Sequence, residues 1–233
     1  MPIADAVLND KLTTSENQRI TIKPGETKII EKYELYPGYI IGFLQDIDIT
    51  SVNGTNSDYT IRTVLSKNDG DLTKIQSEPV PIDRAAAHPR GVWPFSTILA
   101  EFPAYTVGSP EIGYNISNGQ TDHLQTVENS LSKVNGTVGN PGHFGVVYKV
   151  NIPIVNSSGG PKVIRLILAG RGGLYSGAIK MNGKVLLVPT LKAGTEYVDL
   201  PEYTVQGDTD MISLEIMHAG GASLPAAIYI NSQ

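Results

Sequence analysis

Cysteine is absent from the 233-residue sequence, which excludes disulfides, thiolate metal sites and cysteine nucleophiles. Charged residues are scarce at 18%, and the net charge of −5 comes with no long basic run. The charge therefore gives no electrostatic reason to expect nucleic acid or an anionic membrane surface as a partner. The longest apolar runs, near residues 39–44 and 163–169, are far too short to span a bilayer. We expect neither nucleic-acid binding nor a membrane span.

Turn residues are abundant instead, with 24 Gly and 15 Pro. They separate runs rich in β-branched and aromatic residues, such as "RITIK" (19–23), "YIIGFLQDIDITSV" (39–52) and "DYTIRTVLSK" (58–67). From residue 143 to the end of the chain, further runs of this kind follow one another closely. This pattern is typical of antiparallel sheets. We predict an all-β fold, an antiparallel two-sheet β-sandwich of about a dozen strands.

Three segments support more local predictions. "VIRLILA" (163–169) is apolar almost throughout and predicts a central strand that is buried on both faces. Asn182 and Gly183 stand between two apolar runs, which predicts a hairpin with a type I′ turn. Residues 122–134 are the best candidate for one short helix, because Leu124, Val127 and Leu131 fall on one helical face.

The domain organisation follows from the distribution of these runs. Residues 1–18 are mostly polar, and we expect them to form a flexible N-terminal arm. Residues 19–233 are expected to form a single β-sandwich unit. The alternative is two packed subdomains with a seam near residues 157–161, a Ser-Ser-Gly-Gly-Pro segment that also fits a hairpin turn.

Two glycine-rich corners directly follow apolar strands and are the first candidate site. One contains Arg171, Gly172 and Gly173, and the other begins at His218 and continues through Ala-Gly-Gly. Consecutive backbone N–H groups in such turns bind anions, and a nearby Arg or His adds positive charge. The expected ligand is therefore a phosphate, a sulfate or a sugar carboxylate. The competing interpretation is a corner at which a strand bends between sheets, and we favour this interpretation.

A proline-rich loop over residues 79–95 is the second candidate site. It contains His88, Arg90 and Trp93, which is the only Trp of the chain. An aromatic ring beside Arg and His is a reasonable sugar-binding set, because Trp stacks on the apolar face of a sugar. The alternative is a loop that is pinned by a buried Trp and by Arg bonds to carbonyls, and we favour this alternative.

The sequence predicts no cofactor, no metal site and no catalytic residues. The four histidines form neither HxH nor HExxH, so a zinc site would need ligands from distant parts of the chain. No P-loop, dinucleotide-binding or GxSxG pattern is present. Carboxylate pairs for glycoside hydrolysis are not singled out among the 23 acidic residues.

Five stretches together carry a resemblance to a known group of proteins. They are "HPRGVWPFS" (88–96), "NPGHFGVVYKV" (140–150), "AGRGGLYSGAIKMNGK" (169–184), "LKAGTEYVDLPEYTV" (191–205) and "EIMHAGGASLPAAI" (215–228). The sequence resembles the β-rich region of secreted or cell-surface proteins of Firmicutes that are often labelled after a copper amine oxidase N-terminal-like, or stalk, domain. The resemblance implies export to a bacterial cell or spore surface, with a signal peptide removed. It implies no copper chemistry, because the domain behind that label is not found here.

We therefore expect a non-enzymatic exported structural or binding module of a bacterial cell or spore surface. Its expected partner is itself, in a homo-oligomer or fibre formed when the N-terminal arm adds to the sheet of a neighbour. The first alternative is a module that binds cell-wall glycans through Trp93, Arg90 and Arg171. The second alternative is a hydrolase acting on polysaccharides.

Overall fold

The structure is a computed structural model, and it describes residues 2–12, 19–39, 42–54, 58–67, 70–81, 89–132, 134 and 136–232. The chain divides into two compact units. The first unit comprises Met1–Thr13 together with Pro81–Gln233, and the second comprises Thr14–Val80. The two units are described separately below.

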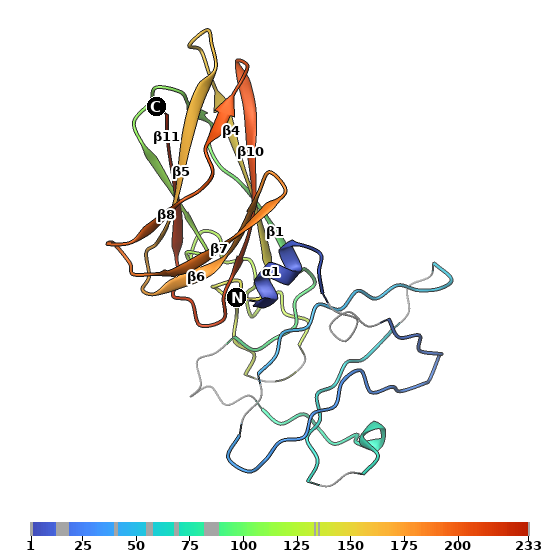
Figure 1. The fold of residues 1–233 in the computed structure, drawn as a ribbon. Coiled ribbons are helices and arrows are strands. Elements are labelled where there is room, and N and C mark those ends of the chain that lie inside the picture. Colours follow the sequence, from blue (N-terminus) through green and yellow to red (C-terminus); the bar gives the residue numbers. More distant parts are fainter. Residues whose placement is uncertain are drawn as a thin grey trace. The chain divides into compact units, whose positions relative to one another are not determined.

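The first unit contains two β-sheets (Figure 1). The six-stranded sheet has the order β1-β4-β10-β6-β7, and β2 also pairs with β4. Its strands are β1 (Thr97–Glu101), β2 (Tyr105–Thr106), β4 (Val147–Val155), β6 (Tyr175–Met181), β7 (Lys184–Leu191) and β10 (Thr209–His218).

The five-stranded sheet has the order β3-β11-β5-β8, and β9 also pairs with β5. Its strands are β3 (Ile112–Ile116), β5 (Lys162–Gly170), β8 (Tyr197–Asp199), β9 (Tyr203–Val205) and β11 (Ala226–Ser232). Strand β5 lies in the interior of this sheet, between β11 on one side and β8 and β9 on the other.

Apolar side chains from both sheets meet in one core. Ile152 and Ile212 come from the six-stranded sheet, Leu166 and Ile228 come from the five-stranded sheet, and all four are fully buried. The all-β two-sheet sandwich is thus confirmed, with eleven strands among the described residues. It is not antiparallel throughout, because β1 and β2 both run parallel to β4. Residues 107–146 separate β2 from β4, which leaves ample chain for parallel crossovers.

Two of the local predictions agree with the structure. Strands β6 and β7 form a hairpin in which Asn182 and Gly183 have φ angles of 51° and 73°. Positive φ at both positions is the requirement of a type I′ turn. The predicted central strand is β5, and its inward residues Ile164, Leu166 and Leu168 are fully buried. The prediction that both faces are buried is wrong for the other face, where Val163, Arg165 and Ala169 are only half-buried, and this face carries the site described below.

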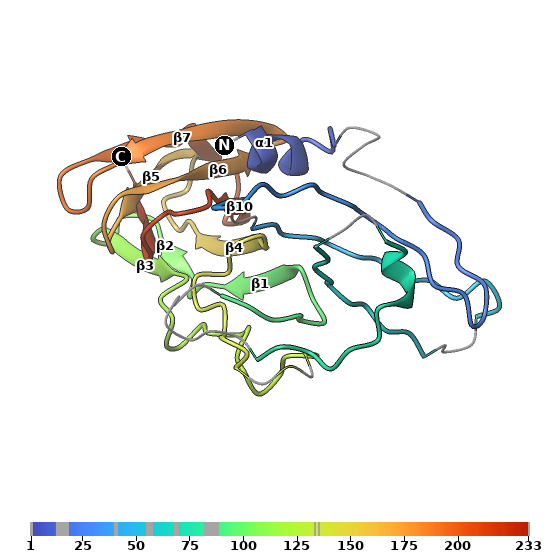
Figure 2. The same ribbon diagram turned by 90° about the horizontal axis from the view of Figure 1, so that it is seen from below.

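The N-terminal segment differs from the flexible arm that its polarity predicted. Residues Pro2–Leu8 form helix α1, which packs against β6, β7 and β10 (Figure 2). Ala4 and Leu8 are buried against Ala178 and Met217. Burial of one small apolar face stabilises a helix too short to form alone in water. Residues 13–18 of the predicted arm lie outside the described residues.

The predicted helix at residues 122–134 is wrong. This segment consists of turns and bends where it is described, and Leu124, Val127 and Leu131 are 43–53% exposed. Polar side chains satisfy the backbone locally: Asn129, for example, donates from Nδ2 to the carbonyl of Leu124 and accepts at Oδ1 from the amide of Thr126. Asn, Ser and Thr compete with helical hydrogen bonds in this way, and the apolar spacing was too weak to override them.

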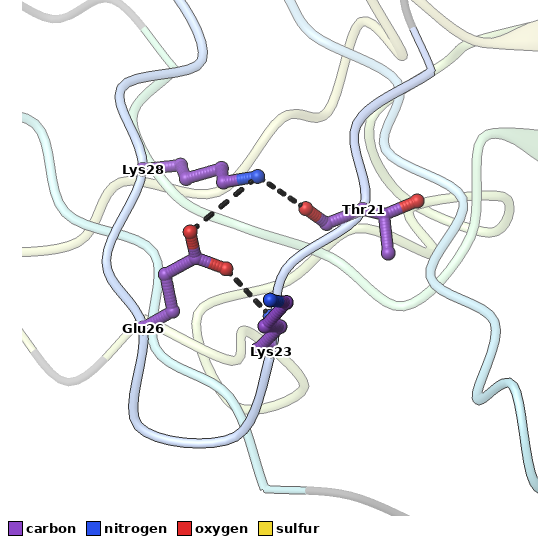
Figure 3. A network of polar contacts seen from close by, with 4 residues as sticks. All are labelled: Thr21, Lys23, Glu26 and Lys28. Atoms are coloured by element: carbon purple, nitrogen blue, oxygen red, sulfur yellow. Dashed lines mark hydrogen bonds and ion pairs between the residues drawn. The ribbon is translucent and has the colours of Figure 1, made fainter.

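The second unit has turns where the sequence predicted them, but the described part contains no β-strand. A turn at Pro24 and Gly25 is closed by the amide of Glu26, which donates to the carbonyl of Lys23 over 3.0 Å. The Glu26 carboxylate accepts from the Lys23 amide, and Lys28 Nζ reaches across to the Thr21 carbonyl (Figure 3). The predicted strands at 19–23, 39–52 and 58–67 have no regular secondary structure and no sheet pairing wherever the structure describes them.

The boundaries of the two units lie elsewhere than the predicted seam. Residues 157–161 join β4 of one sheet to β5 of the other within the first unit. Asn156 fixes this connection by donating from Nδ2 to the carbonyls of Gly160 and Gly207. The segment is therefore a corner between the two layers of the sandwich.

Candidate functional site

The first glycine-rich corner takes the chain from β5 in one sheet to β6 in the other. The backbone N–H groups of Arg171 and Gly172 both donate to the carbonyl of Pro225, over 2.9 and 3.1 Å. These are the groups that an anion-binding turn would need to keep free. The backbone of this corner therefore binds the protein itself, and the anion-binding interpretation of Gly172 and Gly173 does not fit this geometry.

Glycine is required here for close approach of two backbones. A Cβ atom on Gly172 would run into the carbonyl group of Leu224 and lie 3.0 Å from the nitrogen of Pro225. A Cβ atom on Gly173 would lie 2.8 Å from both Cβ and Oγ of Ser223. Gly173 also has a φ of 149°, which side chains rarely allow.

The second glycine-rich corner lies directly against the first. The amide of Ser223 donates to the carbonyl of Leu174 over 2.7 Å, and the amide of Ala219 donates to the carbonyl of Ser176 over 3.0 Å. The sequence showed only that both corners follow apolar strands, and the structure brings them into contact. The side chain of His218 is buried and is therefore not accessible to a ligand at the surface.

His218 belongs to a buried chain of hydrogen bonds. Its Nε2 lies 2.9 Å from the hydroxyl of Ser117, and its Nδ1 lies 3.1 Å from the hydroxyl of Tyr175. The Ser117 hydroxyl also lies 3.2 Å from Nδ1 of His143. Burial lowers the pKa of His218 to about 3 and that of His143 to about 4, where Asp122 acts in the opposite direction. Both rings are therefore neutral at pH 7.

The direction of this chain follows from one backbone donor. The amide of Leu124 donates to Nε2 of His143, so the proton of this ring is on Nδ1. Nδ1–H then donates to Ser117, whose hydroxyl donates to Nε2 of His218, whose Nδ1–H donates to the oxygen of Tyr175. Every member is buried and has at least one hydrogen-bond partner, which makes this chain of bonds a structural link rather than a ligand site.

The side chain of Arg171, unlike its backbone, is turned toward the outer face of the five-stranded sheet. Its Nη1 donates to the hydroxyl of Tyr229 over 2.8 Å. No carboxylate among the described residues forms an ion pair with Arg171. The neighbouring Arg165 does have such a partner, since its Nη2 lies 2.7 Å from a carboxylate oxygen of Asp199. Arg171 thus keeps most of its N–H donors for a ligand.

Arg171 borders an open groove of about 360 Å³, which we call the Arg171 groove. Its lining residues are Glu111, Ile167, Ala169, Gly170, Arg171, Gly194, Thr195, Glu196, Tyr197 and Tyr229. Ile167 and Ala169 come from the outer face of β5, Tyr229 comes from β11, and Tyr197 comes from β8. The groove therefore lies over β5, between its two neighbouring strands.

The ring of Tyr229 packs over Gly113, and it can do so because that neighbour is a glycine. Gly113 pairs with Tyr229, and a Cβ atom on Gly113 would lie 2.7 Å from Cε1 and 2.9 Å from Cδ1 of the ring. The φ of Gly113 does not require glycine. Its role is to leave room for the ring, which the bond from Arg171 then holds at its hydroxyl end. The result is an aromatic surface with a fixed orientation.

The two carboxylates of the groove already have partners. Glu111 accepts from Nδ2 of Asn231 over 2.8 Å. Glu196 accepts from the amide of Lys192 over 2.9 Å, and its other oxygen lies 3.9 Å from Nζ of the same residue. Such carboxylates are held in place and retain lone pairs that accept from hydroxyl groups.

The loop candidates lie elsewhere in the first unit. Trp93 is half-buried, covers Gly91, and donates from Nε1 to the carbonyl of Thr126 over 2.8 Å. Arg90 is exposed, and its backbone forms a two-bond bridge with Val138. These contacts agree with a loop that is pinned by its Trp. The remaining candidate, His88, lies outside the described residues.

The described residues contain no group of three or more His, Asp or Glu side chains arranged to hold a metal ion. Within the same residues, no helix has the length and apolar character needed to cross a bilayer.

Comparisons with known proteins add little. No protein-family model matches the chain, and no curated protein sequence matches it. One structural neighbour is the tryptic core variant of Cry1Da from Bacillus thuringiensis, with 12% sequence identity and a TM-score of 0.24. The match covers 45% of this chain and 22% of the Cry1Da chain. At this TM-score the likeness carries no argument about function.

The sequence singled out Arg171 but missed the tyrosines around it. Tyr229 stands between Ile228 and Ile230, and Tyr197 stands two residues before Asp199. In both runs the alternation of apolar and polar residues places the tyrosine on the outer face of its strand. This signal was available, but only the pairing of β11 and β8 with β5 shows that the two tyrosines flank one groove.

Proposed function

We propose that this protein is a non-catalytic binding module of a bacterial cell or spore surface, and that it binds carbohydrate in the Arg171 groove. The observation that carries the proposal is the aromatic ring of Tyr229, which packs over Gly113 and is bonded at its hydroxyl by Arg171. An aromatic face stacks on the C–H face of a sugar ring, while nearby charged groups bind its hydroxyls.

The surroundings of the ring support carbohydrate over a small charged ligand. Arg171 supplies free N–H donors, and Glu111 and Glu196 supply acceptors. A sugar hydroxyl can therefore accept a hydrogen bond from Arg171 and donate one to a carboxylate. The carboxylates are engaged by Asn231 and Lys192, which suits binding more than acid–base catalysis. The surface location rests on the resemblance described above.

Affinity electrophoresis tests this proposal. The protein is run through gels that contain glycol chitin, β-glucan, xylan or galactomannan, and we expect retardation by at least one of them. Tyr229→Ala and Arg171→Gln should abolish it. Leu99→Ala, which removes an exposed apolar side chain from the other sheet, and Lys180→Gln should not. Retardation that survives both groove variants contradicts the proposed site, and release of reducing ends contradicts a non-catalytic module.

We also propose that the second unit mediates self-association. Its described residues include many exposed apolar side chains on chain without sheet pairing, among them Tyr33, Phe43, Ile47 and Ile49. Extended chain with apolar side chains and unpaired backbone groups is stabilised by pairing with another strand, and a second copy of the same segment supplies one. This replaces the N-terminal arm as the contact.

Size-exclusion chromatography with light scattering tests self-association on the intact chain. Ile49→Lys places a charge on the apolar side of the segment, and Thr50→Lys places the same charge on the opposite side. We expect oligomers for the native chain and for Thr50→Lys, and a monomer for Ile49→Lys. A monomeric native chain contradicts the proposal.

A further inference from the structure

Two tyrosines border the Arg171 groove, and each is tied to an arginine that follows or belongs to β5. The hydroxyl of Tyr229 accepts from Arg171. The pKa of the Arg165 guanidinium is raised chiefly by its bond to Asp199 and to a lesser extent by Tyr197, which places Tyr197 beside Arg165. The two tyrosine–arginine pairs therefore lie on opposite sides of β5.

The strand register fixes how far apart these tyrosines are. Tyr229 pairs with Ile167, and Tyr197 pairs with Ala169, so the tyrosines lie on the two strands that flank β5 and are offset by two residues along it. With the usual spacing between strands and between residues, their Cα atoms are about 12 Å apart. The ring of Tyr229 lies over Gly113 of β3, on the side away from β5, so the ring does not shorten this gap.

Tyr197 is the more open of the two rings, because Tyr229 is half-buried. Tyr197 is 57% exposed. In the part of the chain that the structure describes, neither ring stacks on another aromatic ring. The floor between them is formed by Ile167 and by Ala169, whose small side chain keeps the groove open.

We infer that the groove binds an extended oligosaccharide rather than a single sugar, with Tyr229 and Tyr197 contacting different units of one chain. This inference rests on the proposed function. Tyrosines whose Cα atoms are this far apart, on strands to either side of β5, are not placed to sandwich one pyranose, which contacts a ring only at van der Waals distance. A chain that lies across the groove reaches both rings, and its second contact is intramolecular once the first has formed.

Isothermal titration calorimetry with a length series tests the inference. The ligands are oligomers of one to six units of the sugar whose polymer retards the native protein in the four-gel screen. We expect the affinity to rise by about tenfold or more between one unit and four units. Tyr197→Ala should remove this rise and leave the single unit unaffected, whereas Tyr229→Ala should weaken every length. Tyr197→Phe keeps the ring and should keep the rise.

Two results would overturn this inference and leave carbohydrate binding intact. The first is a single sugar that binds as tightly as the longest oligomer. The second is a Tyr197→Ala variant, shown to be folded by its thermal melting, in which all lengths lose affinity by the same factor. Retardation by none of the four polymers contradicts the proposed function and the inference together.

Discussion

The hydroxyl of Ser117 lies 2.9 Å from Nε2 of His218, and this contact joins the two sheets. Ser117 directly follows β3 of the five-stranded sheet, and His218 ends β10 of the six-stranded sheet. Through His143 the same chain of bonds continues to the long loop between β3 and β4. One buried polar link therefore fixes three parts of the sandwich, and it holds only while both imidazoles are neutral.

Acid should destabilise the protein through these two histidines. Their folded pKa values, about 4 for His143 and about 3 for His218, lie below the ordinary value of 6.5. The unfolded chain therefore takes up protons first, so this stability is present above pH 6.5 and is lost as the pH falls toward 4 for His143 and toward 3 for His218. At pH 5 the loss is about 2 kcal/mol for each histidine. Urea unfolding at pH 7, 6 and 5 measures it.

Single substitutions separate this effect from general acid sensitivity. His218→Gln should remove about half of the pH dependence between pH 7 and pH 5. His123→Gln, which removes a half-buried histidine outside the chain of bonds, should leave most of it. Asp122 faces His143 and favours its charged form, so Asp122→Asn should steepen the dependence slightly. An unchanged slope in His218→Gln would show that this explanation is wrong.

The corner at Gly172 should tolerate no side chain. Gly172→Ala places a Cβ atom onto the carbonyl group of Leu224, so two backbones must separate, at a cost of about 1–3 kcal/mol. Gly220 lies in the neighbouring corner, and a Cβ atom there meets nothing within 4 Å. Gly220→Ala is therefore the matched control and should be close to neutral. Thermal melting compares the two, and equal melting temperatures would contradict the close approach.

Sequence patterns predicted the second half of the chain well. Asn182 and Gly183 were decisive, because few residues other than Gly and Asn accept positive φ, and a type I′ turn needs it twice. The run 163–169 was decisive for a central strand, since so many consecutive apolar residues indicate neighbours on both edges, although one face of β5 is only partly covered. Both signals depend only on neighbouring residues, which is why the sequence sufficed.

The predictions that failed depended on tertiary contacts. Helix α1 is only seven residues long and exists because Ala178 and Met217 cover Ala4 and Leu8. The apolar spacing of Leu124, Val127 and Leu131 indicated a helix, but no apolar surface covers them. Likewise, the sequence singled out Arg171 because the glycines beside it suggested an anion-binding turn. The proposed groove site depends instead on the contact of its side chain with Tyr229, which is 58 residues away in the sequence.

Tyr229 and Gly113 should show energetic coupling, because the ring of Tyr229 rests on Gly113. Gly113→Ala pushes against the ring, which breaks the bond to Arg171 and weakens glycan binding. In a Tyr229→Ala background the same change meets no ring and should be almost harmless. We expect a coupling energy of about 1 kcal/mol from urea unfolding of the two single variants and the double variant. Additive effects would show that the ring does not rest on Gly113.

Trp93 should matter for stability and not for binding. Its Nε1 donates to the carbonyl of Thr126, and its ring covers Gly91, so it ties residues 91–93 to the loop that contains Thr126. Trp93→Phe keeps an aromatic ring but loses the donor, and we expect a loss of about 1 kcal/mol in the free energy of unfolding. Glycan affinity should stay unchanged, while Tyr229→Ala should lower it in the same assay. A Trp93→Phe variant that unfolds like the native protein but no longer binds glycan would move the binding site from the Arg171 groove to this loop.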